Sequence, residues 1–335
     1  EIPSCCVPVL LPQCYDYHSC MQDQNDTRHY KLSRRARLVR QLTAFYMRHR
    51  DPAAIEWQSA RAQLDFFAGL VPSAAGVTAE MTEIAGLKAN SMQTRSPAAG
   101  KVLLYWHGGA YVMGSCRSHR ALVSHLAKAT GVRAILPEYR LAPENPFPAA
   151  IEDALAVYRC LLREGYSASD IAVAGDSAGG GLTVAMLLAL RDAGEPLPAA
   201  VALMSPWLDL SGEGESMQTH CERDPWFNPQ DLPHVVRHYC KPEQLHEPLV
   251  SPIFGELSGM PPCLIQVGDD EILLSDSERL AQKIIAAGGQ VELDVWPGMW
   301  HVWQMFIGLM PESRSAIEKM GGFVRGALKL QPEAK

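Results

Sequence analysis

The chain has 335 residues, of which 47% are hydrophobic and 20% charged, a balance typical of a protein with one large core. Thirty basic and thirty-seven acidic side chains give a net charge of -7, and no basic run carries interleaved aromatics. We therefore expect no nucleic-acid partner. No apolar stretch approaches the roughly 20 residues of a membrane span, so none is expected.

Residues 1–26 differ in composition from the rest of the chain. They hold four of the nine cysteines and only one short apolar run, without the basic start and longer apolar region of a signal peptide. We interpret them as a leader that is disordered or not native. The odd cysteine total, with the other five scattered, argues against a disulfide framework and favours a reducing compartment. The expected location is cytoplasmic.

Two amphipathic helices are predicted at 32–48 and 52–70 from their apolar spacing, within a cap region assigned to residues 27–72. No convincing strand precedes Lys101. From there to the end, short apolar runs alternate with helical segments, which predicts a mostly parallel sheet with helices on both faces. The strands are expected at 102–106, 132–136, 171–174, 200–204, 263–267 and 291–295, and the helices at 119–130, 149–163, 178–193, 275–287 and 312–328.

Residues 73–335 are thus predicted to form one catalytic domain. The stretch at about 211–259 interrupts it with scattered Gly, Pro, Glu and His residues among aromatic ones. An insertion at this point lies over the carboxyl ends of the sheet. We expect it to form a small helical cap together with the two leading helices.

The segment around Ser177 carries the strongest chemical signal. A buried strand, the run Gly175-Asp-Ser-Ala-Gly179 and a helix follow one another, which is the pattern of a nucleophile elbow. The serine is held in a strained turn that projects its hydroxyl, and small neighbours avoid collisions there. The amide of Ala178 and the positive end of the helix dipole then face the reacting carbonyl oxygen.

A second glycine-rich turn, His107-Gly-Gly-Ala110, follows the strand at 102–106. Such a turn offers bare backbone N–H groups to the oxyanion of a tetrahedral intermediate. The predicted donors are Gly108, Gly109 and Ala178, and Ala110 is a further candidate. His107 itself is interpreted as a structural histidine that holds the loop.

His301 lies just past the last predicted strand, where a general base can reach Ser177. The order nucleophile, acid, histidine matches the order along this type of fold. The candidate acids are Glu271 and Asp270, which follow the strand at 263–267. Either carboxylate can orient the imidazole and stabilise its charged form.

These motifs together resemble the bacterial esterase branch of the hormone-sensitive lipase family, which has the α/β-hydrolase fold. The resemblance runs from about Lys101 to the end of the chain. Two further segments, 137–150 and 205–209, are also family-like, and we interpret them as loop and ion-pair support around the site. The resemblance places Glu271 on the family's acid position. Asp270 is the alternative, because a one-residue bulge in the backbone would place Asp270 there instead. It also implies N-terminal cap helices and frequent homodimers.

The expected reaction is the hydrolysis of a small carboxylic ester of short to medium chain through an acyl-enzyme. No cofactor or metal is required. His234 and His238 are four residues apart but have no third ligand at metal-site spacing. An amidase or deacetylase acting on a small acylated metabolite is the alternative among hydrolases, and a non-catalytic small-molecule receptor is the alternative of another class. Several apolar side chains are candidates to line an acyl pocket, although core packing explains them as well: Tyr111, Met113, Trp226, Phe227, Met299 and Trp303.

Overall fold

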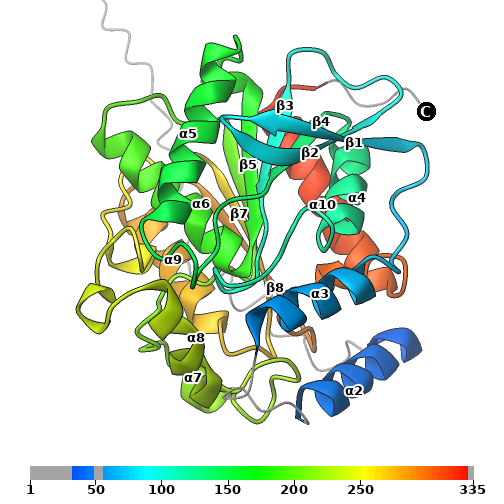
Figure 1. Cartoon of the computed structure of the whole chain (residues 1–335), viewed down its shortest axis with the longest axis vertical. Coiled ribbons are helices and arrows are strands. Elements are labelled where there is room, and N and C mark those ends of the chain that lie inside the picture. The colour runs from blue at the N-terminus through cyan, green and yellow to red at the C-terminus, as the bar shows by residue number, and fades with distance from the viewer. Residues whose placement is uncertain (1–31, 49–55, 331–335) are drawn as a thin grey trace, which may run out of the picture. The chain divides into compact units, whose positions relative to one another are not determined.

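An eight-stranded sheet forms the centre of the computed structural model, which describes residues 32–48 and 56–330 (Figure 1). Its strand order is β1-β2-β4-β3-β5-β6-β7-β8. The pairs β1–β2 and β2–β4 are antiparallel, and every later pair is parallel. The strands are β1 (Val77–Ile84), β2 (Leu87–Thr94), β3 (Val102–Trp106), β4 (Arg133–Pro137), β5 (Ile171–Asp176), β6 (Ala200–Met204), β7 (Cys263–Gly268) and β8 (Val291–Trp296). The leader predicted for residues 1–26 lies outside the described residues.

Helices cover both faces of this sheet, and each face has its own apolar core. Alternate residues of β3 point to opposite sides: Leu104 packs in the core with α5, α6 and α9, and Leu103 packs in the core with α4 and α10. Figure 1 shows the two groups of helices on either side of the strands. The helices are α4 (Arg120–Thr130), α5 (Ala149–Arg163), α6 (Ser177–Asp192), α9 (Leu274–Ala286) and α10 (Pro311–Ala327).

The central strands form where the sequence has short apolar runs. All residues of β3, β5, β6 and β7 are buried, as expected of parallel strands with helices on both faces. The helices end by ordinary signals. Gly131 closes α4 in the left-handed conformation, with φ of 70°, and Pro311 begins α10. The predicted sheet with flanking helices is confirmed.

The prediction that no strand precedes Lys101 is wrong. β1 and β2 form an antiparallel hairpin whose turn residues Ala85 and Gly86 have φ angles of 52° and 82°. Most residues of β1 are exposed, since this strand lies at the edge of the sheet. An edge strand needs few apolar residues, so it lacks the continuous apolar run by which the central strands were predicted.

The two leading helices are α2 (Arg34–Arg48) and α3 (Trp57–Ala68). Part of the second predicted helix, at 52–55, lies outside the described residues. Ala36 of α2 is fully buried and packs in a cluster with Met299, Trp300 and Trp303, so α2 lies against the segment that carries His301. The stretch at 211–259 contains α7 (Ser216–Thr219), α8 (Leu232–Tyr239) and the short 3-10 turns η4 (Pro229–Asp231), η5 (Pro242–Gln244) and η6 (Pro252–Phe254).

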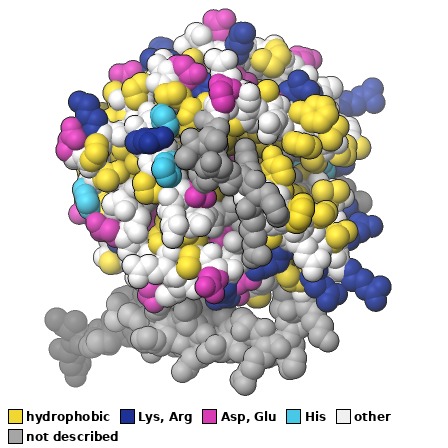
Figure 2. Space-filling view, turned by 60° about the horizontal axis from the view of Figure 1, so that its bottom comes forward, with side chains coloured by type: hydrophobic (Ala, Val, Ile, Leu, Met, Phe, Trp, Pro, Cys, Tyr) yellow, Lys and Arg dark blue, Asp and Glu magenta, His cyan; other side chains and the backbone are white. Residues whose placement is uncertain are grey.

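The surface carries a mixture of charged and apolar side chains. Figure 2 shows basic and acidic groups of both signs interspersed with apolar ones on the face it presents. Large apolar side chains are exposed mainly on α2 and α3 and just after them, among them Leu38, Leu42, Phe66 and Leu70. Within the described ranges, no helix combines the length and the hydropathy needed to cross a bilayer.

Candidate active site

Ser177 lies in the sharp turn between β5 and α6. Its φ of 51° places a non-glycine residue in the left-handed region, a strain that persists only where the surroundings hold it. The turn is closely packed: a Cβ on Gly175 would overlap the carbonyl of Gly179, and a Cβ on Gly179 would overlap the carbonyl of Trp106. Small residues are therefore required on both sides of the serine.

The turn after β3 is strained as well. Gly109, Ala110 and Tyr111 have successive positive φ angles of 118°, 55° and 61°. The N–H of Met113 donates to the carbonyl of Gly109 at 2.9 Å and closes the turn. Because two of the three residues carry a Cβ, this shape depends on contacts with the rest of the fold.

Asp176, next to the nucleophile, anchors this turn. Its Oδ1 accepts hydrogen bonds from the Tyr105 hydroxyl at 2.7 Å and from the Gly108 N–H at 2.9 Å, and His119 Nε2 lies 3.3 Å from Oδ2. Burial opposes ionisation, but the His119 charge and these hydrogen bonds outweigh it and hold the pKa of Asp176 below its ordinary value. The carboxylate thus fastens the glycine turn to the elbow.

The same contact engages one predicted oxyanion donor. The Gly108 N–H already donates to a buried carboxylate, so it is not free to bind a reacting carbonyl oxygen. A Cβ on Gly108 would also overlap the Asp176 carboxylate. Gly108 is therefore part of the anchor of the loop in this structure.

His107 is a buried structural histidine, in line with its interpretation from the sequence. Its ring stacks on Tyr139 with 4.2 Å between centroids, and its Nδ1 lies 2.9 Å from the Gly108 carbonyl. Burial and the nearby His119 lower the pKa of His107 to about 3, so the ring is neutral at ordinary pH.

Glu271 and His301 follow β7 and β8, at the carboxyl edge of the sheet where the elbow and the glycine turn also lie. Their side chains face each other, with 3.7 Å between Glu271 Oε1 and His301 Nδ1. Glu271 is fully buried and His301 is 3% exposed. The distance is longer than a hydrogen bond, as is common at such sites before a substrate is bound.

Asp270 points elsewhere. Its Oδ2 lies 2.6 Å from Arg40 Nη1, and its Oδ1 accepts a hydrogen bond from Arg223 Nε at 2.7 Å. Both carboxylate oxygens are therefore paired with guanidinium groups. Of the two candidate acids, Glu271 is the one that the fold brings to His301.

Ser205 is a site residue that the sequence did not identify by itself. It is fully buried. Its hydroxyl donates to Glu271 Oε2 at 2.8 Å, and its own oxygen, Ser205 Oγ, accepts a hydrogen bond from the Val302 N–H at 3.1 Å. Ser205 opens the family-like segment 205–209, so that resemblance pointed to the region but not to the contact. One hydroxyl thus joins the acid segment to the residue after His301.

Four of the six apolar side chains proposed for an acyl pocket divide into two groups, and the other two, Met113 and Trp226, are partly buried against core clusters. Met299 and Trp303 are fully buried in a core cluster, and Tyr111 is buried and stacked on Tyr239 with 3.9 Å between ring centroids. These three serve packing. Phe227 is half-buried and its ring meets the His301 ring edge-on at 4.8 Å, which places it at the site.

The two histidines of α8 do not form part of a metal site in the described chain. His238 packs edge-on against Trp57, with 5.5 Å between ring centroids. Among the residues placed by the structure, no three His, Cys, Asp or Glu side chains are grouped so that they could hold a metal ion.

Comparison with known proteins points to one family. Residues 103–305 match the family model described as alpha/beta hydrolase fold. An acetyl-hydrolase of Streptomyces hygroscopicus is 48% identical over 68% of this chain and 76% of its own length. An esterase of Acinetobacter venetianus is 36% identical over 78% of this chain and 87% of its own length.

Solved structures agree with the sequence comparison. An esterase from the bacterial hormone-sensitive lipase family superposes with a TM-score of 0.85 at 39% identity, covering 89% of this chain and 100% of the other. A hormone-sensitive lipase from a metagenome library gives a TM-score of 0.85 at 36% identity, with the same coverage. The chain therefore belongs to the hormone-sensitive lipase family of alpha/beta hydrolases.

Proposed function

We propose that this protein hydrolyses carboxylic esters of short to medium acyl chain through an acyl-enzyme on Ser177. Its reaction class, carboxylic ester hydrolysis by a serine hydrolase, follows from the relatives named acetyl-hydrolase and esterase. The observation that carries the mechanism is the buried Glu271–His301 pair, in which 3.7 Å separates a carboxylate oxygen from Nδ1. Such a pair leaves the opposite ring nitrogen, Nε2, as the base.

In the first half of the reaction, His301 takes the proton of the Ser177 hydroxyl as that oxygen attacks the ester carbonyl carbon. The proton gives a charged imidazolium, which the Glu271 carboxylate stabilises. The tetrahedral intermediate then collapses. The bond to the alcohol oxygen breaks, and the imidazolium donates its proton to the leaving alcohol.

Backbone amides stabilise the oxyanion in this step. Since Gly108 is engaged by Asp176, the donors are the N–H groups of Gly109, Ala110 and Ala178. Each such donor contributes about 2.7 to 4 kcal/mol to the stability of the transition state. Ala178 lies in the first turn of α6, where the positive end of the helix dipole adds to the effect.

In the second half, a water molecule replaces the alcohol. His301 removes a proton from the water as it attacks the acyl carbon of the Ser177 ester. Collapse of the second tetrahedral intermediate breaks the bond to the serine oxygen, which regains a proton from His301. The carboxylic acid leaves, and the enzyme returns to its starting state.

The proposal is tested with p-nitrophenyl esters from acetate to decanoate. We expect turnover of the shorter esters by the wild type, loss of activity in Ser177→Ala, and a fall in kcat of at least about a hundredfold in Glu271→Gln. Asp270→Asn, which removes the charge of the neighbouring carboxylate that does not face His301, is the matched comparison, and its activity stays within severalfold of the wild type. A folded wild type that cleaves none of these esters would contradict the proposal and favour a specialised amidase or a receptor.

Three further predictions accompany this function: a cellular location, an oligomeric state and a cap over the site. The cysteine pattern predicts a cytoplasmic location, and the family resemblance implies a homodimer. The helices α2 and α3, together with the stretch at 211–259, are proposed as the cap over the site within the domain of residues 73–335. Such a cap excludes bulk water from the active site.

A further inference from the structure

A second buried carboxylate lies beside the Glu271–His301 pair. Asp224 belongs to the insertion and is 9% exposed. Its Oδ1 accepts hydrogen bonds from the N–H groups of Trp226 at 2.7 Å and Phe227 at 3.1 Å. Its Oδ2 accepts from the Ile272 N–H at 3.0 Å. One side chain thus contacts both the insertion and the segment that carries the acid.

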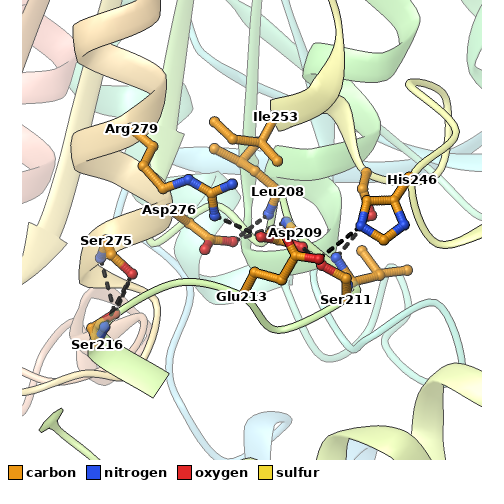
Figure 3. A network of polar contacts seen from close by, with 12 residues as sticks. Leu208, Asp209, Ser211, Glu213, Ser216, His246, Ile253, Ser275, Asp276 and Arg279 are labelled. Atoms are coloured by element: carbon orange, nitrogen blue, oxygen red, sulfur yellow. Dashed lines mark hydrogen bonds and ion pairs between the residues drawn. The ribbon is translucent and has the colours of Figure 1, made fainter. Parts of the chain in front are cut away.

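The insertion holds Ile272 from both sides. Its N–H donates to Asp224, and its carbonyl accepts the Ser216 hydroxyl at 2.6 Å. Ser216 is fixed in turn by Ser275, whose N–H donates to the Ser216 oxygen at 3.0 Å, and Figure 3 shows these two serines side by side. Because Ile272 follows Glu271 directly, the two contacts fix the backbone from which the acid projects.

Asp224 also orients a ring that touches His301. The two hydrogen bonds to its Oδ1 form a tight turn of the backbone from Asp224 to Phe227. At the end of this turn, the Phe227 ring meets the His301 ring edge-on, with centroids 4.8 Å apart. The imidazole is therefore bordered by Glu271 on one side and by a ring that Asp224 positions on another.

The charge of Asp224 acts on the same pair. Burial raises the pKa of Asp224 to about 6, against the pull of the Ile272 N–H and of a positive charge on His301, while Glu271 adds to the rise. The adjacent Arg223 is paired with Asp270, which Arg40 also contacts. The ionisable groups that act on Asp224 directly are thus His301 and Glu271.

We propose that Asp224 is a positioning residue for the ester hydrolysis proposed above: through Ile272 and Phe227 it sets the geometry of Glu271 and His301, and as an anion it favours protonated His301. The inference rests on the proposed function. It gives the insertion a role in the chemistry in addition to covering the site. The protonated imidazole forms in both halves of the reaction, so both halves gain from a second nearby anion.

The test compares Asp224→Asn with Glu222→Gln, an equal change of charge at an exposed residue of the same segment. We expect Asp224→Asn to lower kcat about tenfold or more, with a smaller change in KM, because the pair is displaced. A negative charge raises the pKa of a nearby histidine. Removing the negative charge of Asp224 therefore lowers the pKa of His301 and shifts the acidic limb of the plot of kcat/KM against pH to lower pH. Glu222→Gln leaves both quantities unchanged.

Ser216→Ala separates the two roles of Asp224. It removes the other contact on Ile272 without changing any charge, so it lowers kcat while the acidic limb stays in place. Thermal unfolding shows whether each variant is folded. Wild-type kcat and an unshifted limb in folded Asp224→Asn would overturn the inference. An inactive wild type would instead contradict the proposed function.

Discussion

At the residue scale, the candidate site depends on a few side chains in unusual backbone conformations. Ser177, Ser205 and Val302 all have positive φ angles, of 51°, 44° and 45°. Each lies where a strand or turn passes into the site, and Ser205 bonds both Glu271 and Val302. The strain is thus concentrated around the residues proposed to react.

The Ser205 hydroxyl offers a direct test of this arrangement. Ser205→Ala leaves the buried Val302 N–H without its acceptor and leaves Glu271 Oε2 with the Gly268 N–H as its remaining donor, which we expect to destabilise the fold by about 1 to 3 kcal/mol. We also expect kcat to fall about tenfold or more as the acid shifts. Ser277→Ala is the control, since its buried hydroxyl has no hydrogen-bond partner among the described residues. Equal unfolding free energies and rates for the two variants would contradict the role of Ser205.

Close packing at the elbow gives a second prediction. A Cβ on Gly179 would overlap the carbonyl of Trp106, so Gly179→Ala is expected to cost about 1 to 3 kcal/mol and to lower activity by moving the serine. Gly322→Ala adds the same methyl to α10, where it meets only an ordinary contact, and is expected to stabilise by about 0.5 to 1 kcal/mol. Urea unfolding of both variants checks the contrast in sign.

Some residues of the candidate site can be predicted from the sequence and others cannot. Ser177 and its glycines are found from the order strand, turn and helix, because the elbow requires that local composition. The contact of Gly108 is not predictable, because the motif offers an N–H group but does not reveal that Asp176 binds it. Asp224 carries no signal of its own, since its contact with Ile272 joins residues far apart in the sequence.

At the scale of elements, the structure adds the hairpin of β1 and β2 and the docking of α2. The central strands are predictable because each is an apolar run, whereas β1 is a mostly exposed edge strand and β2, between β1 and β4, carries polar residues among its buried ones. Besides the buried Ala36, the docking of α2 uses the side chain of Arg40. Arg40 binds Asp270, the Gly298 carbonyl at 3.2 Å and the Arg223 carbonyl at 2.7 Å.

Arg40 therefore ties α2 to the segments that carry the acid and the histidine. We expect Arg40→Ala to lower kcat/KM severalfold and to reduce Tm, because three acceptors lose their donor and α2 loosens from the site. Arg37→Ala, at an exposed residue of the same helix, is the matched control and leaves both unchanged. Identical behaviour of the two variants would show that α2 is not held through Arg40.

At the scale of the whole molecule, stability depends on buried carboxylates outside the proposed catalytic residues. Figure 3 shows Asp276 beside Asp209 and Arg279 in a network that joins the loop after β6 to α9. Asp276 Oδ2 accepts the Leu208 and Asp209 N–H groups at 2.8 and 3.0 Å. Burial above all, together with the charge of Asp209, raises the pKa of Asp276 to about 7.

This raised pKa has a defined effect on folding. The folded state holds the Asp276 proton up to about pH 7, whereas the unfolded chain releases it near pH 4. The contribution of Asp276 to stability is therefore full below about pH 4, falls between pH 4 and 7 and is constant above. Asp276→Asn removes this titration. Urea unfolding from pH 4 to 8 should show the free energy of unfolding of the wild type falling relative to that of the variant between pH 4 and 7. A difference between the two that stays constant with pH would contradict the role of Asp276.

The central claim is that Ser177 forms a covalent acyl intermediate. It is tested most directly by treating the protein with diethyl p-nitrophenyl phosphate, which phosphorylates an activated serine irreversibly. We predict release of about one equivalent of p-nitrophenolate, and a diethylphosphoryl group on the peptide that contains Ser177, with neither in Ser177→Ala. A label on another residue, or continued ester turnover by Ser177→Ala, would contradict the account.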